Sequence, residues 1–195
     1  MRLPLVLTFF RVVMSPLFVA LYLFSDSWGV SGAVLPYLLL IIVALCELTD
    51  IFDGFFARKR NQVTSLGKVL DPMADSFFRL SVFFAFTQGD LQLPLMIVLV
   101  FFWRDSLVNT LRSLCALQGI PLAARASGKI KAVVQAIVTF FILILMIPYT
   151  NGCLSLESFQ QMSYMAAGLA AAYTLYSGCE YLFVHRQMIK KAFKV

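Results

Sequence analysis

Six long apolar segments, separated by short polar connectors, constrain the fold of this chain more than any other feature. Each segment is close to the roughly 20 residues that a helix needs to cross a bilayer. Hydrophobic residues make up 61% of the chain, against about 45–50% in soluble domains, and this excess cannot be buried inside one small domain. We therefore expect an all-α integral membrane protein with six transmembrane helices, at residues 4–24, 33–57, 72–88, 93–115, 129–148 and 160–184.

The basic residues fall on one side of this arrangement. The connectors around residues 25–32, 88–92 and 149–159 contain no lysine or arginine, and all 16 basic residues belong to the other side. Because basic residues that flank membrane spans stay in the cytoplasm, we expect both termini to be cytoplasmic. The net charge of +6 then reflects membrane orientation and attraction to anionic lipids, and no nucleic-acid partner is expected because the chain has no soluble basic module.

No linker, low-complexity tract or internal repeat divides the chain, so we expect a single membrane domain over residues 1–195. The first apolar segment has the length of a secretory signal peptide. However, Arg11 interrupts it and no small-residue cleavage site follows, so we expect this segment to remain in the mature protein.

Four aspartates interrupt the apolar pattern between residues 50 and 75. Asp50 and Asp53 share one face of a helix, as do Asp71 and Asp75, because residues three or four apart are neighbours on a helix. Carboxylates that converge near a membrane repel one another unless cations lie among them. Oxygen ligands without sulfur or imidazole suit Mg²⁺, Mn²⁺ or Ca²⁺, and two such ions commonly serve phosphoryl transfer. The alternative is that the aspartates cap helices or form ion pairs, and Asp71-Pro72 has the form of a helix start.

These aspartates are part of a longer pattern. Asp50-x-x-Asp53-Gly54-x-x-Ala57-Arg58, then eight residues, then Gly67-x-x-x-Asp71-x-x-x-Asp75, resembles the complete signature of the CDP-alcohol phosphotransferase family. The resemblance implies that an acceptor hydroxyl attacks a CDP-linked donor and that CMP leaves. It implies that the four aspartates hold two divalent cations, Mg²⁺ or Mn²⁺, and that Asp75 is also the general base. The CDP-binding residues that it implies are Asp50, Gly54, Ala57, Arg58 and Gly67.

Three further segments resemble one branch of this family, the bacterial phosphatidylglycerophosphate synthases. They are Pro4-x-x-Leu7-Thr8-x-x-Arg11, the stretch WRDSLVNTLRSLCALQGIPLAARASGKIKAVVQ, and YTLYSGCEYL near the end of the chain. This branch implies CDP-diacylglycerol as donor, glycerol 3-phosphate as acceptor, a homodimer, and a bacterial cytoplasmic membrane with the active site facing the cytoplasm. The chain departs from the pattern at Leu5, where asparagine is usual, and at Ser76, where lysine is common. Glu47 is an additional carboxylate, which we expect to pair with Arg11 or Arg79.

A cluster of basic residues around the connector between the fourth and fifth segments favours a phosphorylated acceptor. A neutral acceptor such as serine needs no phosphate pocket, whereas positive-inside bias accounts for only part of this charge. Inositol phosphate carries the same anionic group and remains the alternative acceptor. A non-enzymatic divalent-cation carrier is the alternative of a different class. The predicted acceptor-phosphate residues are Arg104, Arg112, Arg125, Lys129 and Lys131.

Overall fold

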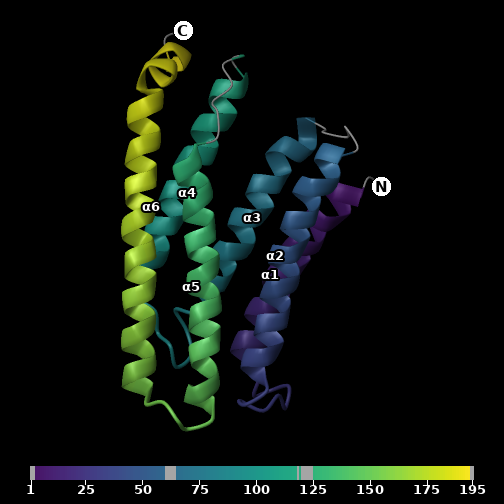
Figure 1. Cartoon of the computed structure of the whole chain (residues 1–195), viewed down its shortest axis with the longest axis vertical. Helices are drawn as coiled ribbons and strands as arrows, with labels where there is room; N and C mark the ends of the chain where they lie inside the picture. The colour runs from purple at the N-terminus through teal and green to yellow at the C-terminus, as the bar shows by residue number, and fades with distance from the viewer. Residues whose placement is uncertain (1–2, 60–64, 118, 120–124, 194–195) are drawn as a thin grey trace.

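The computed structural model of the chain describes the backbone of residues 3–59, 65–117, 119 and 125–193, and the side chains of residues 9–49, 73–115, 119 and 125–189. Over these residues it consists of α-helices without strands (Figure 1), which confirms the all-α prediction. The six helices are α1 (Leu3–Phe24), α2 (Leu35–Lys59), α3 (Ser65–Ala85), α4 (Leu95–Leu117), α5 (Ala126–Thr150) and α6 (Leu156–Phe193).

The start of α3 differs from the prediction. The helix begins at Ser65 instead of residue 72, so Asp71-Pro72 lies inside it and does not form its first turn. Leu66, Val69 and Leu70 extend the apolar spacing of the helix toward its start. A proline inside a helix removes one backbone hydrogen bond, and this chain also tolerates Pro16 inside α1 and Pro148 inside α5.

The end of α6 also differs from the prediction. This helix has 38 residues and continues to Phe193, nine residues beyond the predicted end of the apolar segment. At ~1.5 Å per residue it is about 57 Å long, longer than the ~30 Å hydrocarbon core of a bilayer. Hydropathy predicted only the apolar part of this helix, because the polar residues that continue the helix beyond residue 184 give no hydropathy signal.

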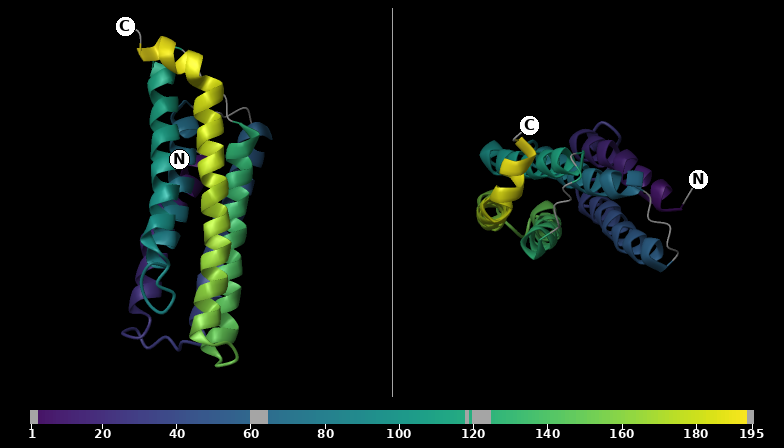
Figure 2. Two further views of the ribbon diagram at one scale, coloured as in Figure 1. Left: turned by 90° about the vertical axis from the view of Figure 1, so that its left-hand side faces the viewer. Right: turned by 90° about the horizontal axis from the view of Figure 1, so that it is seen from above.

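The helices pack as two groups of three. α1 contacts α2 and α3, whereas α6 contacts α4 and α5, and the two groups meet where α2 contacts α5 and where α3 contacts α4 and α5. Figure 2 shows these groups side by side when the bundle is viewed from above. Phe18, Phe83, Phe86 and Phe101 are fully buried at the centre of the core. The connectors 25–34, 86–94 and 151–155 lie at one end of the bundle, the lower end in Figure 1, and contain no lysine or arginine.

Apolar side chains also cover much of the outer surface. Leu169, Phe183 and Ile137 are each more than 60% exposed. Within the described residues, α5 is the one helix that is long and apolar enough to cross a membrane, with a mean hydropathy of 2.5. Shorter apolar stretches occupy Phe9–Phe24 and Leu35–Thr49. An apolar exterior of this extent is typical of a surface that meets lipid.

Candidate functional site

The predicted metal ligands belong to two consecutive helices. Asp50 and Asp53 lie near the end of α2, whereas Asp71 and Asp75 lie in the first half of α3. The end of α2 and the start of α3 both lie toward the upper end of the bundle in Figure 1. The side chains of Asp50, Asp53 and Asp71 lie outside the described residues, so their role as ligands stays a prediction. The same holds for the predicted CDP-binding residues, which are Asp50, Gly54, Ala57, Arg58 and Gly67.

Asp75 is the signature aspartate whose side chain the structure describes. Its Oδ1 accepts a hydrogen bond from Nη1 of Arg11, a buried residue of α1. Its Oδ2 lies 3.9 Å from Nη2 of Arg79, one turn further along α3. Arg79 also lies 3.7 Å from Oε1 of Glu47 on α2, which confirms the predicted pairing of Glu47. The carboxylate of Asp75 is therefore held by arginines from α1 and α3.

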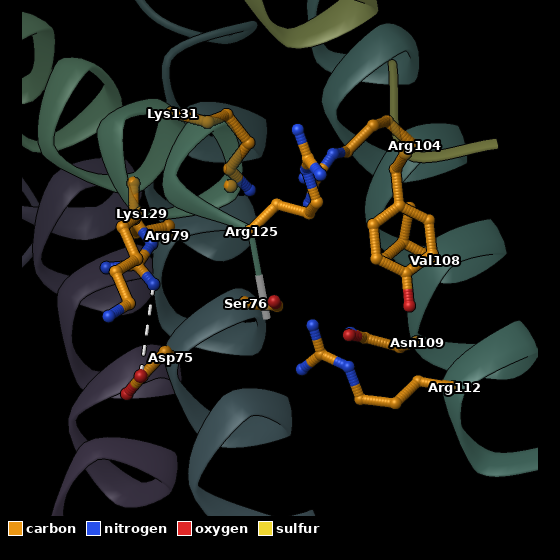
Figure 3. Close-up of a pocket in the computed structure, with 13 residues that line it drawn as sticks. Asp75, Ser76, Arg79, Arg104, Val108, Asn109, Arg112, Arg125, Lys129 and Lys131 are labelled. Atoms are coloured by element: carbon orange, nitrogen blue, oxygen red, sulfur yellow. Dashed lines mark ion pairs between the residues drawn. The ribbon is translucent and has the colours of Figure 1, made fainter. Parts of the chain in front are cut away.

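A cavity of about 260 Å³ opens beside Asp75, between α3, α4, α5 and α6 (Figure 3). Among the described residues, six basic side chains line it, against one carboxylate, that of Asp75. Figure 3 shows the guanidinium of Arg112 reaching from α4 toward Ser76 and Asp75 on α3. The cavity is smaller than the ~300–1,000 Å³ sites of drug-sized ligands, so it suits a small anion. The six basic residues are Arg79 and the five predicted from the sequence, namely Arg104, Arg112, Arg125, Lys129 and Lys131.

Besides Arg79, three of these cations already have carboxylate partners. Nζ of Lys131 lies 2.6 and 2.8 Å from the two carboxylate oxygens of Asp105, and both residues are buried. Arg104 Nη1 donates to the same carboxylate at 3.1 Å. Arg125 Nη2 lies 2.5 Å from Oε1 of Glu180 on α6. These pairs link neighbouring elements of the cavity wall, α4 with α5 through Asp105 and the start of α5 with α6 through Glu180.

Other polar groups in the cavity wall have no partner. Within the described part of the chain, Arg112 and Lys129 form no ion pair. Four buried atoms of the wall make no hydrogen bond there: Nε of Arg79, Arg104 and Arg112, and the hydroxyl oxygen of Tyr181. A buried donor without an acceptor costs about 1–3 kcal/mol. An anion with several oxygens would satisfy donors of this kind, so the chemistry of the wall matches a phosphate group.

The first turn of α5 adds a backbone donor to this wall. Arg125 is the N-cap residue, and its side chain makes no capping hydrogen bond. Gly128 follows in the first turn and lines the cavity, whereas the backbone N–H of Lys129 already donates to the carbonyl of Arg125 at 3.4 Å. The first amide groups of a helix lack intrahelical acceptors and favour an anion. The sequence predicted this helix start at residue 129, three residues later than the structure has it.

Three residues of this region were not predicted as site residues. Arg79 and Asp105 are ionisable residues within apolar segments, a signal that marks functional positions in membrane proteins. Tyr181 carries no such signal of its own, although it is the last tyrosine of the YTLYSGCEYL segment. His185 supports Tyr181 from the next turn of α6, with ring centroids 4.4 Å apart. Which tyrosine enters the cavity depends on the packing of α6 against α4.

Comparison with known proteins identifies a family and relatives that this chain resembles. A family described as CDP-alcohol phosphatidyltransferase matches residues 1–175. A protein of Bacillus subtilis (strain 168), named CDP-diacylglycerol–glycerol-3-phosphate 3-phosphatidyltransferase, is 32% identical over 195 residues, covering 97% of both chains. Proteins with the same name are 31% identical over 69% of this chain and 71% of the relative in Rickettsia typhi (strain ATCC VR-144 / Wilmington). In Escherichia coli (strain K12) the match is 39% identical over 38% of this chain and 37% of the relative.

Proposed function

The chain belongs to the CDP-alcohol phosphatidyltransferase family, and from this premise we propose that it transfers the phosphatidyl group of CDP-diacylglycerol to glycerol 3-phosphate. The products are phosphatidylglycerophosphate and CMP. The observation that carries the choice of acceptor is the cavity beside Asp75, whose described wall holds six basic side chains and one carboxylate. The positive charge and the small volume of this cavity suit a small dianion that binds next to Asp75.

Asp75 connects the acceptor to the chemistry. An acceptor hydroxyl forms a bond to the phosphorus that carries diacylglycerol, and the bond from that phosphorus to the oxygen of CMP breaks. We propose that Asp75 takes the proton of the attacking hydroxyl. Arg11 and Arg79 hold both oxygens of this carboxylate, so they orient it toward a substrate in the adjoining cavity. A positioned general base contributes roughly 10²–10⁴ in rate.

The basic residues of the wall bind the acceptor phosphate in this proposal. Arg112 and Lys129 are the strongest candidates, because the described residues offer them no ion pair. Arg125 and Lys131 contribute positive potential and shape, since Glu180 and Asp105 partly balance their charges. Arg104 shares Asp105 with Lys131, and its Nε has no partner among the described residues, so it is a further candidate. Inositol phosphate carries the same anionic group and is the competing acceptor.

Two divalent cations, Mg²⁺ or Mn²⁺, complete the proposal. Asp50, Asp53, Asp71 and Asp75 would hold them, and this all-carboxylate set has the hard oxygen donors that these ions prefer. When bound, the cations would neutralise the diphosphate of the donor and stabilise the leaving CMP. CDP would contact Asp50, Gly54, Ala57, Arg58 and Gly67. Chelation with EDTA is expected to stop CMP release and added Mg²⁺ or Mn²⁺ to restore it; activity that persists after thorough chelation would refute the metal requirement.

The membrane arrangement follows from the charges. We propose six transmembrane helices in one domain over residues 1–195, with both termini and the cavity on the cytoplasmic side of a bacterial inner membrane. The end of the bundle without lysine or arginine then faces away from the cytoplasm. Membrane lipids surround the apolar exterior, and the protein forms a homodimer. Labelling of single cysteines placed in the connectors from either side of the membrane tests this topology.

An acceptor panel tests the function. Purified protein in detergent is given CDP-diacylglycerol, Mg²⁺ and one of four acceptors: glycerol 3-phosphate, inositol phosphate, inositol or serine. We expect CMP release with glycerol 3-phosphate and at most weak release with the other three. Preference for inositol phosphate would reassign the acceptor, and a protein that releases no CMP with any acceptor but transports divalent cations would be a carrier.

A further inference from the structure

The side chain of Arg104 is fixed by several contacts, which a contribution to the positive potential alone would not require. Its Nη1 donates to Oδ1 of Asp105 at 3.1 Å, and its Nη2 donates to Oγ of Ser177 at 2.9 Å. Ser177 is fully buried in α6, and the arginine side chain is only 11% exposed. Two hydrogen bonds of known direction therefore fix the plane of the guanidinium.

Two glycines surround the same side chain. A Cβ added to Gly178 of α6 would lie 3.1 Å from Cγ of Arg104, and one added to Gly128 of α5 would lie 3.2 Å from its Nη2. Both distances are shorter than an ordinary van der Waals contact. Glycine is less favourable than alanine inside a helix, so two glycines at these positions need a structural reason. The close approach of Arg104 supplies it.

A third glycine provides a contrast on the same helix. A Cβ added to Gly168 of α6 would meet no atom within 4 Å. Among the described glycines, the approach to Arg104 is therefore specific to Gly128 and Gly178. These two glycines belong to the Gly-Lys-x-Lys and Ser-Gly motifs of the sequence, and the proposed chemistry gives a role to the lysines of the first motif but none to either glycine.

We propose that Gly128, Ser177 and Gly178 are positioning residues that form a slot for Arg104 and make its guanidinium the rigid contact for the acceptor phosphate. A free arginine loses much rotamer entropy when it binds a ligand. In this slot the side chain is ordered before the acceptor arrives, which strengthens binding through preorganisation. The inference rests on the proposed function, because it names the acceptor phosphate as the ligand of Arg104.

The test compares Gly178→Ala and Gly128→Ala with the matched control Gly168→Ala. We expect each of the first two to raise the KM for glycerol 3-phosphate about threefold to tenfold, the effect of moving one side chain off its preferred rotamer. The KM for CDP-diacylglycerol and the Tm should match those of Gly168→Ala. Equal effects of Gly178→Ala and Gly168→Ala on the acceptor KM would overturn the proposal.

A double variant separates the slot from a general effect on the helix. In an Arg104→Ala background, Gly178→Ala should cause no further rise in the acceptor KM, because the side chain that it displaces is absent. A rise of the same size in both backgrounds would show that Gly178 acts without Arg104, and the slot would be rejected.

A binding measurement keeps the slot separate from the proposed reaction. Inorganic phosphate should raise the Tm of the wild-type protein and of Gly168→Ala alike, and raise that of Gly178→Ala less. If no acceptor yields CMP but this difference is seen, the proposed function fails and the slot stands. If glycerol 3-phosphate yields CMP but neither the KM nor the phosphate-induced Tm shift distinguishes the glycines, the function stands and the slot fails.

Discussion

The two ends of the bundle differ in how their polar groups are hydrogen-bonded. At the end without lysine or arginine, which we call the closed end, tyrosines from three helices make hydrogen bonds to the connector 86–94. Tyr149 of α5 donates to Asp90 at 2.8 Å, Tyr22 of α1 donates to the Gln88 carbonyl at 3.1 Å, and the hydroxyl of Tyr164 of α6 lies 2.8 Å from the carbonyl oxygen of Gln92. At the basic end, the cavity wall keeps buried donors without partners.

This difference separates stability from function. Local hydrogen bonds that satisfy a connector stabilise the fold and require nothing from outside. Unsatisfied donors and concentrated positive charge destabilise a fold, so they persist where a ligand supplies the missing partners. The closed end should therefore respond to mutation through stability, whereas the basic end should respond through turnover and acceptor binding.

The largest effect is expected at Asp75. Asp75→Asn should lower turnover about 10²–10⁴-fold, because a neutral amide does not serve as a general base. Single-turnover rates measure this loss, and equilibrium binding of CDP-diacylglycerol and divalent cation should persist. The matched control is Asp90→Asn at the closed end, which should leave turnover unchanged. If Asp75→Asn keeps more than about a tenth of wild-type turnover, then Asp75 only binds metal and is not the general base.

The buried pair of Asp105 and Lys131 should show the next largest effect. Asp105→Ala leaves a buried lysine without its carboxylate, so we expect the free energy of unfolding to fall by about 3–5 kcal/mol. Denaturation in detergent micelles measures it. The double variant Asp105→Leu with Lys131→Met should recover part of the stability, since it removes both charges of this pair but leaves Arg104 without its carboxylate. A loss below about 1 kcal/mol in the single variant would contradict this assignment.

Arg112 and Lys129 should affect acceptor binding specifically. Arg112→Ala or Lys129→Ala removes a charge-assisted hydrogen bond of about 1.5–3 kcal/mol, so the KM for glycerol 3-phosphate should rise about 10- to 100-fold. The KM for CDP-diacylglycerol should change little. Arg186→Ala removes a charge outside the cavity wall and serves as the control. Equal rises for both substrates would mean that these cations serve folding or topology.

The smallest effect is expected at the closed end. Tyr149→Phe removes the hydrogen bond to Asp90 and should lower the free energy of unfolding by about 0.5–1.5 kcal/mol, without changing either KM. Thermal unfolding beside steady-state kinetics measures both. Tyr37→Phe, at a half-exposed position, is the matched control and should leave the Tm unchanged. A changed acceptor KM in Tyr149→Phe would show that the two ends are coupled.

The sequence predicted the elements whose signals are local. Apolar segments located the six helices, because each helix exposes one continuous apolar run. The start of α3 and the end of α6 were wrong, since Pro72 resembles a helix start and the polar end of α6 has no hydropathy signal. The basic residues were predicted as a cluster from their proximity in the chain and their side of the membrane, and the structure brings all five to one cavity.

The partners of those basic residues could not be predicted. Asp105 of α4 pairs with Lys131 of α5, two helices that both pack against α6, and Glu180 of α6 pairs with Arg125 at the start of α5. These pairings depend on helix rotation and register, which a single sequence does not specify. The glycines that surround Arg104 were visible as motif positions, but their closeness to one side chain follows only from the packing of α4, α5 and α6.

The ion pairs and hydrogen bonds of the basic end also determine when the cavity can be completed during synthesis of the chain. Arg11 is separated from Asp75 by 64 positions along the chain, and Arg104 from Ser177 by 73. At a synthesis rate of about 5–20 residues per second, 73 residues take about 4–15 seconds. The first five helices therefore leave the ribosome before α6 supplies the partners of Arg104 and Arg125. The last helix to be made completes the cavity wall, so a chain interrupted before α6 would lack the side of the cavity that Tyr181 lines.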